Sequence, residues 1–217
     1  MVSHWQDVEV DPRLLRFSVH GDWWETLRDL DVTLLVTREY EHLVMAMRVT
    51  ESGPAISFMT LPHPSGMAFD GKRGVVHIAS TRNPNQIWDL APITGLVCRP
   101  DTKGTEITDR PLLPVRSRTF PGFMYLHDLA MIGGQLHANS VGQNAVVRLG
   151  DMGEYERVWW PLCIERDGRP MVEQNHLQLN SIAAGPNLRS SFYSASSATL
   201  SARRPGHRNY PVDGRGV

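Results

Sequence analysis

The stretch Pro64–Leu90, PSGMAFDGKRGVVHIASTRNPNQIWDL, shares its pattern with two later stretches. These are Leu126–Leu149, LHDLAMIGGQLHANSVGQNAVVRL, and Leu179–Ala198, LNSIAAGPNLRSSFYSASSA. Each copy opens with a small or polar pair and a short apolar strand. A turn containing glycine follows, and then a second strand that ends in small polar residues. The chain therefore carries a weak internal repeat of β-hairpins.

The three copies align at Gly66, Asp128 and Ser181, which lie 62 and 53 residues apart. A repeat of about 40–60 residues, each an antiparallel meander, is typical of a β-propeller blade. Small and polar side chains suit the innermost strands of blades, because these strands converge and leave little room. The alternative is a β-sandwich whose hairpins merely look alike. We expect an all-β, propeller-like fold.

The region before the repeat predicts one short helix and three strands. Trp23–Asp31, WWETLRDLD, has the length of one or two helical turns. Three apolar runs of strand length follow, each bounded by polar or turn residues: Val32–Arg38, Leu43–Val49 and Ala55–Leu61. We expect one domain, residues 1–217, with an N-terminal extension over residues 1–31 and blade-like repeats from about residue 32.

Composition excludes several classes of protein. The 217 residues carry a formal net charge of -1 and are 41% hydrophobic. These values differ from those of disordered, collagen-like or strongly basic nucleic-acid-binding chains. No apolar run is long enough for a membrane helix, and Met1–Pro12 does not resemble a secretory signal. The two cysteines, Cys98 and Cys163, form no disulfide framework, and we expect both to be small buried residues. We expect a cytoplasmic protein that binds neither nucleic acid nor membrane.

Several strings of low degeneracy carry a resemblance to a known family. They are ASTRNPNQIW (Ala79–Trp88), YLHDL (Tyr125–Leu129), GQNAVV (Gly142–Val147), ERVWW (Glu156–Trp160), LQLNSIAAGP (Leu177–Pro186) and RRPGHRNYPVDGRGV (Arg203–Val217). From about Thr33 onward, the chain resembles the bacterial family called domain of unknown function 4915 (DUF4915). The resemblance implies a six-bladed propeller and assigns no activity.

The length of the chain departs from that family pattern. Six blades of about 50 residues each need about 300 residues. The 217 residues therefore hold about four blades. We expect an incomplete six-bladed ring that is truncated at its C-terminus. An open ring exposes a sheet edge at each end, which favours self-association through these edges.

The aligned copies place Ser65, His127 and Asn180 in one column. Blades are related by rotation, so a column projects toward one level of the channel. His127 and Asn180 are then expected to meet near the axis, with Asn139 or His176 close by. An imidazole and an amide oxygen can bind a divalent metal such as Ca, Mg or Zn. Alternatively, they hydrogen-bond each other, the backbone or water, without a chemical role.

Asp128 directly follows His127, and neighbouring residues of a strand point to opposite faces. Both side chains therefore face the axis only where a bulge intervenes. We expect Asp128 instead to cap a turn or to accept hydrogen bonds from backbone amides between blades.

The loop Arg82–Asn85, RNPN, offers Arg82 as a bidentate partner for a carboxylate or phosphate. The alternative is a structural turn, because Asn and Pro dominate turns. Gly142–Asn144 occupies the equivalent place in the next copy, which favours a repeated turn. We expect Trp159–Trp160 to pack mainly in the core. The basic stretch Arg203–Arg208 is either an anion contact or a solvated loop.

Two hypotheses from different functional classes follow. The first is a ligand-binding or interaction module that takes a small molecule at the channel mouth. The mouth is lined by loops that hold Arg82, Asn83, Asn139 and His176. The second is a metal-dependent hydrolase of the lactonase type, with His127 and Asn180 as axial metal ligands and a metal-bound water that attacks an ester. The second hypothesis rests on analogy of fold.

Overall fold

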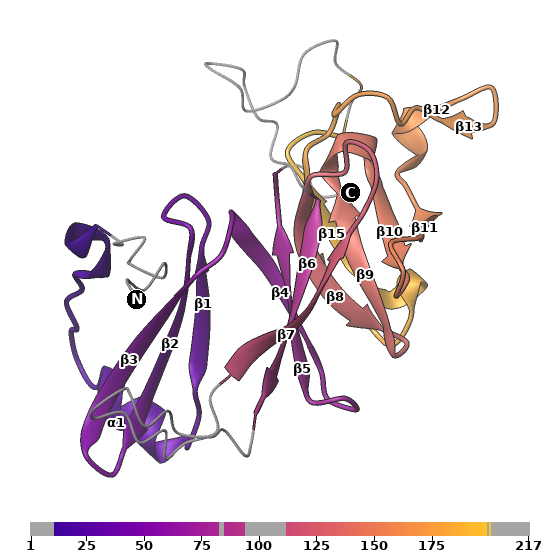
Figure 1. Cartoon of the computed structure of the whole chain (residues 1–217). Coiled ribbons are helices and arrows are strands. Elements are labelled where there is room, and N and C mark those ends of the chain that lie inside the picture. Colours follow the sequence, from indigo (N-terminus) through magenta and orange to yellow (C-terminus); the bar gives the residue numbers. More distant parts are fainter. Residues whose placement is uncertain (1–10, 83–84, 94–111, 199, 201–217) are drawn as a thin grey trace, which may run out of the picture.

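The computed structural model describes residues 11–82, 85–93, 112–198 and 200 (Figure 1). The helices are η1 (Pro12–Leu15), α1 (Trp23–Asp29), η2 (Val141–Gln143), η3 (Leu162–Ile164) and η4 (Leu188–Ser190). The strands are β1 (Leu34–Arg38), β2 (Leu43–Thr50), β3 (Gly53–Thr60), β4 (Pro64–Asp70), β5 (Val75–Ser80), β6 (Gln86–Pro92), β7 (Leu112–Thr119), β8 (Leu126–Ile132), β9 (Gln135–Ser140), β10 (Ala145–Leu149), β11 (Tyr155–Trp159), β12 (Glu165–Arg166), β13 (Arg169–Pro170), β14 (Leu179–Ala183) and β15 (Phe192–Ala195).

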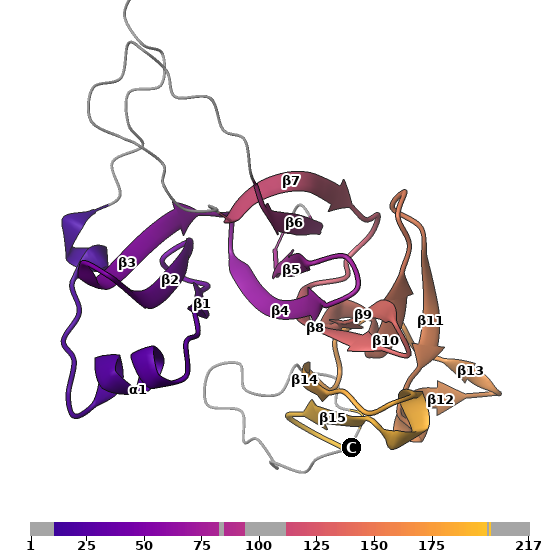
Figure 2. The same cartoon turned by 90° about the horizontal axis from the view of Figure 1, so that it is seen from below.

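The strands form four antiparallel meanders that follow one another along the chain. We call them the first blade (β1–β2–β3), the second (β4–β5–β6–β7), the third (β8–β9–β10–β11) and the fourth (β14–β15). A small hairpin, β12–β13, stands between the third and the fourth. Figure 2 shows β4 and β8 toward the middle of the assembly and β7 and β11 on its rim. The predicted all-β, propeller-like fold is confirmed.

The predicted elements agree closely with the observed ones. The helix expected over Trp23–Asp31 is α1, which buries Leu27 and packs against β2. The three strands expected next are β1, β2 and β3. The three repeat copies begin with the hairpins β4–β5, β8–β9 and β14–β15. Within the described part of the chain, no helix is long and apolar enough to cross a membrane.

The first blade begins differently from the others. Glu39 directly follows β1, and its carboxylate accepts a hydrogen bond from the hydroxyl of Thr81, which directly follows β5, at 2.7 Å. Strand β1 therefore ends where β5 ends and where β4 begins. This direction makes β1 the equivalent of β5 and β9, the second strands of their blades. The described part of the first blade thus comprises the second, third and fourth strands of the repeat.

A bulge recurs at the same place in three blades. The register of the first hairpin shifts between Pro64 and Met67 in the second blade and between Leu126 and Leu129 in the third. The fourth blade shifts at the corresponding step, after Leu179. Each bulge contains the two aligned columns of the repeat, namely Ser65–Gly66, His127–Asp128 and Asn180–Ser181. A bulge frees two neighbouring residues from regular strand alternation.

The bulge residues join neighbouring blades through hydrogen bonds. The hydroxyl of Thr37 donates to the carbonyl of Ser65 at 2.7 Å, and the hydroxyl of Ser65 donates to the carbonyl of His127 at 2.8 Å. The carboxylate of Asp128 accepts from the backbone N–H of Ile182 at 2.8 Å. The prediction that Asp128 binds a backbone amide of another blade is confirmed.

Gly66 allows the second and third blades to approach closely. A Cβ atom at this position would lie 2.3 Å from Cα of Asp128 and 2.6 Å from the backbone nitrogen of Leu129. Both contacts are with backbone, which cannot move aside without breaking the bulge. Position 66 therefore has no room for a side chain between β4 and β8.

A second set of bonds ties each blade to the chain that enters the next one. Asn85 and Asn144 directly precede the third strands β6 and β10. The Asn85 side-chain oxygen accepts from the backbone N–H of Tyr125 at 3.1 Å. The Asn144 oxygen accepts from the N–H groups of His176 at 2.8 Å and Leu177 at 3.1 Å. Asn85 and Asn144 thus share a structural role, as the equivalence of their positions in the repeat predicted.

The residue before each innermost strand has a left-handed backbone. His63, Tyr125 and Gln178 precede β4, β8 and β14 with φ of 43°, 49° and 51°. The carbonyl groups of all three accept a hydrogen bond from the residue that follows the second strand of the same blade. In the first blade, His42 takes the place of Asn85, since its Nδ1 accepts from the N–H of His63 at 3.1 Å.

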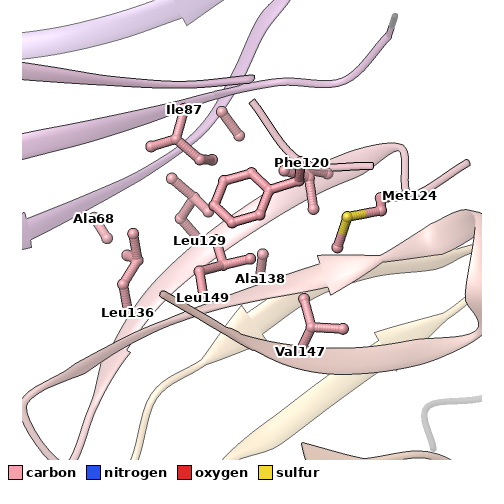
Figure 3. Packing of buried hydrophobic residues seen from close by; sticks show 11 residues of the cluster. Ala68, Ile87, Phe120, Met124, Leu129, Leu136, Ala138, Val147 and Leu149 are labelled. Carbon is pink, nitrogen blue, oxygen red and sulfur yellow. The ribbon is translucent and has the colours of Figure 1, made fainter. Parts of the chain in front are cut away.

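Two apolar clusters fill the space between the sheets. Figure 3 shows the larger one, between the second and third blades: Ala68, Ala79, Ile87, Phe120, Met124, Leu126, Leu129, Leu136, Ala138, Val147 and Leu149. The smaller one, between the first and second blades, consists of Val44, Leu61, Ile78 and Leu90. Successive residues of β5 contribute to different clusters, because Ile78 faces the first blade and Ala79 faces the third.

We predict that Gly66→Ala lowers the free energy of unfolding by about 3 kcal/mol, because the methyl group collides with backbone of the third blade. The matched control is Gly71→Ala, whose Cβ would meet only a side-chain atom of Phe69 at 3.7 Å. Urea unfolding of both variants measures the difference. Equal stability of the two variants would contradict the close approach of β4 and β8.

Candidate functional site

The loops that carry most of the predicted site residues gather at one end of the blades, where the innermost strands begin. The hydrogen bonds of Asn85 and Asn144 hold the loops that precede β8 and β14 at this end. Arg82 is exposed here, with its Nε 4.0 Å from the carboxylate of Glu39. His176 is half-buried beside Asn144. Asn83 lies outside the described residues.

His127 and Asn180 occupy equivalent positions in the neighbouring strands β8 and β14. His127 is half-buried and Asn180 is exposed. The His127 carbonyl accepts from the Ser65 hydroxyl, so the backbone of His127 is tied to the preceding blade. Neither side chain has a hydrogen-bond partner among the described residues. The imidazole and the amide therefore keep their polar groups available at the start of adjacent inner strands.

The structure corrects the predicted position of Asn139. This residue lies in β9, the second strand of the third blade, and is completely buried. Its neighbour Ala138 packs in the apolar cluster of the second and third blades, so Asn139 points away from that cluster toward the other face of the sheet. Neither polar atom of its amide has a hydrogen-bond partner among the described residues. Asn139 therefore does not line the mouth.

The metal hypothesis calls for a cluster of ligands around His127 and Asn180. Within the described ranges, no three His, Cys, Asp or Glu side chains gather as they would around a metal ion. His127 and Asn180 would supply one nitrogen and one oxygen ligand. A complete metal site would need further ligands beside these two.

Burial changes the acidity of the bulge carboxylate. Removal from water raises the pKa of Asp128 above its usual value, while hydrogen bonds from the N–H groups of Ile182 and Leu129 and the nearby imidazole of His127 act in the opposite direction. The hydrogen bond from Ile182 also shows that the Asp128 carboxylate holds β14 against β8.

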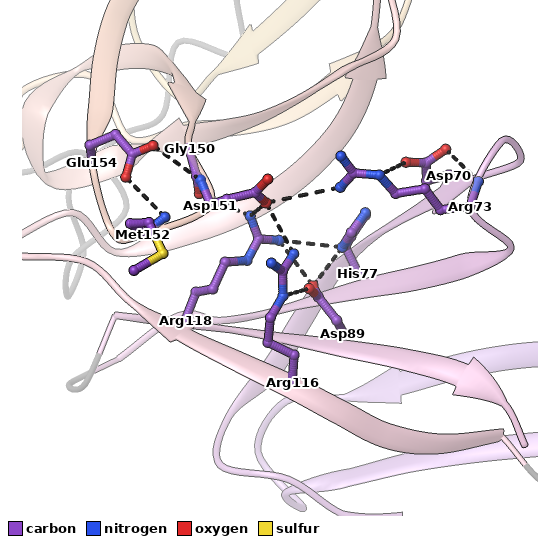
Figure 4. Close-up of polar contacts among 10 residues, drawn as sticks. All are labelled: Asp70, Arg73, His77, Asp89, Arg116, Arg118, Gly150, Asp151, Met152 and Glu154. Atoms are coloured by element: carbon purple, nitrogen blue, oxygen red, sulfur yellow. Dashed lines mark hydrogen bonds and ion pairs between the residues drawn. The ribbon is translucent and has the colours of Figure 1, made fainter.

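A charged cluster that sequence reasoning missed lies at the opposite end of the blades. It consists of His77 on β5, Asp89 on β6, Arg116 and Arg118 on β7, and Asp151 after β10 (Figure 4). Three of these residues, His77, Arg118 and Asp151, line a cavity of about 710 Å³ between the second and third blades, which we call the inter-blade cavity. The cavity is lined mainly by polar groups, including the turns β4–β5, β8–β9 and β10–β11.

Asp89 is the centre of this cluster and is almost completely buried. Its Oδ1 lies 2.6 Å from Nδ1 of His77 and accepts from Nη2 of Arg118 at 2.9 Å. Its Oδ2 accepts from Nε of Arg116 at 2.7 Å. Because Asp89 accepts the hydrogen bond, Nδ1 of His77 carries the proton. In the neutral ring, Nε2 of His77 then keeps its lone pair.

The charges around Asp89 lower its pKa. Burial acts to raise this pKa, but the hydrogen bonds from His77 and Arg116 and the positive charge of Arg118 outweigh it. The carboxylate therefore stays ionised at neutral pH. A buried ion pair of this kind costs several kcal/mol when one partner is removed, because the other charge is left unpaired.

The sequence holds a faint signal for this cluster. Asp89 lies between Trp88 and Leu90 in the mainly apolar strand β6. Arg116 and Arg118 alternate along β7, so both face the same side. Arg118 reaches its partners from 29 positions away. The pairing of β6 with β5 and with β7 brings these charges together.

Both tryptophans of the pair expected in the core are only half-buried. Trp159 stacks on Tyr193 of β15, with ring centroids 4.2 Å apart, so it joins the third and fourth blades. The indole N–H of Trp160 donates to the carboxylate of Glu165 at 2.9 Å. Cys163 is half-buried, not fully buried as expected. Cys98 and the basic stretch Arg203–Arg208 lie outside the described residues.

We predict that Asp89→Asn lowers the free energy of unfolding by about 3 kcal/mol at pH 7. Because the pKa of Asp89 is lower in the folded state, its contribution is fully present above the unfolded value of about 4 and is lost as the pH falls toward the folded value. The gap between wild type and variant should therefore narrow below about pH 4. Urea unfolding between pH 2 and 7 measures it.

The control for this series is Asp167→Asn, which changes an exposed aspartate in the β12–β13 turn. Its effect should be small at every pH. A gap between wild type and Asp89→Asn that stays constant from pH 7 to pH 2 would contradict the assigned ion pairs of Asp89.

Three solved structures are similar to this chain. They are a catalytically inactive virginiamycin B lyase from Staphylococcus aureus with quinupristin (15% identity, 76% of this chain and 45% of that chain, TM-score 0.45), a selenomethionine-substituted virginiamycin B lyase from Staphylococcus aureus (12%, 82% and 54%, 0.44) and a streptogramin B lyase (12%, 82% and 66%, 0.44). The chain thus spans about half to two thirds of the length of these structures.

A search of curated proteins gave no match. The sequence profile described as Domain of unknown function (DUF4915) matches residues 21–212, which is most of the chain. This match confirms the family resemblance noted in the sequence. The chain therefore belongs to the DUF4915 family.

Proposed function

We propose that this protein is a ligand-binding propeller module whose site lies where the innermost strands begin, at His127 and Asn180. The observation that carries the proposal is the recurring bulge. It frees two residues in each inner strand. In the third blade one of them, Asp128, bonds the next strand, while His127 and Asn180 keep side chains without partners among the described residues.

The surroundings of these two side chains suit a small polar molecule. Tyr125, two residues before His127, is 40% exposed, and its ring stacks on Phe123 with centroids 6.4 Å apart. Phe123 is itself 68% exposed. Together with the exposed guanidinium of Arg82, this end of the blades offers an aromatic surface beside hydrogen-bonding groups. Few polar groups beside apolar surface are typical of ligand sites.

The alternative proposal is a metal-dependent hydrolase of the lactonase type. His127 and Asn180 would hold a divalent cation, which supplies a Lewis acid for ester hydrolysis when bound. The two proposals differ in one requirement, because the hydrolase needs the cation and the binding module does not. The same variants therefore test both.

The test combines a thermal-shift screen with calorimetric titration. The probes are small carboxylates, amides and lactones, and separately Ca²⁺, Mg²⁺ and Zn²⁺. We expect a compound that raises Tm to bind at least tenfold more weakly to His127→Ala and Asn180→Ala. The control is Ser181→Ala, which changes an exposed hydroxyl in the same bulge and should leave the affinity unchanged.

Each outcome decides between the proposals. Binding of an organic probe without added cation, lost in His127→Ala, supports the binding module. A cation that binds stoichiometrically and is lost in the same variant favours the hydrolase and calls for an assay of lactone cleavage. Ligands whose affinity is unchanged in both alanine variants would overturn the assignment of His127 and Asn180.

A further inference from the structure

We propose that the inter-blade cavity is a second binding site, for a small molecule that carries a phosphate group. The site lies at the opposite end of β8 from His127, so it does not depend on the function proposed above. Its volume of about 710 Å³ falls within the range of small-molecule sites. Its lining is mainly polar, which suits a charged ligand.

The acidic side chains of the lining are occupied within the protein. The carboxylate of Asp70 accepts from the backbone N–H groups of Lys72 and Arg73 at 3.0 and 3.2 Å. The carboxylate of Glu154 accepts hydrogen bonds from the backbone N–H groups of Asp151 and Met152 at 3.2 and 2.9 Å. These carboxylates hold the turns that frame the cavity.

A third acid of the lining, Glu156, is paired as well. The carboxylate of Glu156 bonds the guanidinium of Arg148 across the strands β10 and β11. The acids of the lining thus repel an entering anion less than their number suggests, because each already has a positively charged or N–H partner.

The basic side chains, in contrast, keep donors in reserve. Arg118 is 6% exposed, and its Nε has no hydrogen-bond partner among the described residues. Lys72, on the β4–β5 turn, forms no ion pair within the described part of the chain. The Nε of Arg118 is itself buried, whereas the ammonium of Lys72 is exposed and open to a ligand oxygen.

Asp151 shows how the cluster receives a negative charge. One of its oxygens, Oδ1, lies 3.1 Å from Nη2 of Arg116, 3.7 Å from Nη1 of Arg118 and 3.9 Å from Nη1 of Arg73. Only the first of these distances is a hydrogen bond. The side chain of Asp151 is also 53% exposed. A single half-exposed carboxylate therefore faces three guanidinium groups without satisfying them.

A phosphate group suits this arrangement better than Asp151 does. It carries up to two negative charges and several acceptor oxygens, which can bond two guanidinium groups at once. The ligand phosphate would displace Asp151 from Arg118 and Arg73. Lys72 lies on the same lining, and its ammonium would contact the phosphate oxygens. Asp151 is then a competitor for the ligand.

The test titrates the full chain with inorganic phosphate by calorimetry at low ionic strength, with acetate as the monoanion for comparison. Lys72→Ala should weaken phosphate binding at least fivefold. Asp151→Asn should strengthen it at least threefold, because it removes the competing charge. Arg169→Ala, an exposed arginine on β13, is the matched control and should change nothing.

A fourth variant separates binding from folding. In His77→Asn, the amide nitrogen takes the place of Nδ1 and keeps the bond to Asp89, while Nε2 is lost. We expect this variant to retain its Tm within a few degrees and to bind phosphate as wild type does, because Nε2 of the neutral ring carries no hydrogen to donate. Urea unfolding of each variant shows that it is folded.

Three results would overturn the proposal. The first is the absence of phosphate binding by wild type and by Asp151→Asn. The second is an Asp151→Asn variant that binds phosphate no better than wild type, which would make the cluster a purely structural contact between blades. The third is equal affinity for acetate and phosphate, which would contradict the preference for a dianion.

Discussion

The close approach of innermost strands is the constraint on which the rest of the structure depends. Where β4 passes β8, there is room for hydrogen at Gly66 and for nothing larger. The bulge at this point takes two residues out of regular alternation, so that one of them can bond the next strand. Ser65 and Asp128 both do so, through opposite chemistry, since the hydroxyl donates and the carboxylate accepts. The blades are joined at their inner edge by these bonds and farther out by apolar side chains.

The turn residues extend this linkage to the loops. Asn85 and Asn144 are nearly or completely buried and accept hydrogen bonds from the chain that enters the next blade. The same turn therefore fixes both the end of one blade and the start of its neighbour. Asn and His combine a short side chain with an acceptor, which suits this position. These bonds and the bulge together position the candidate binding residues His127 and Asn180.

Sequence reasoning found the parts that the repeat encodes. The columns of Ser65 and Gly66 coincide with the bulges, and the equivalence of the Asn85 and Asn144 turns follows from their spacing. It missed features that need long-range pairing. Asn139 was expected to line the channel because small polar residues end the second strand. Strand alternation instead places its side chain on a buried face of the sheet. The charges around Asp89 meet through the pairing of β6 with β5, which brings His77, and with β7, which brings the two arginines.

The central claim is that a side chain of one inner strand holds the backbone of the next. Native-state hydrogen exchange of the Ile182 amide tests it most directly, because this N–H donates to Asp128 of the preceding blade. The account predicts that Asp128→Ala speeds exchange at Ile182 at least tenfold relative to the slowest amides of β10, in a protein that remains folded. An unchanged relative exchange rate at Ile182 would contradict the inter-blade hydrogen bond.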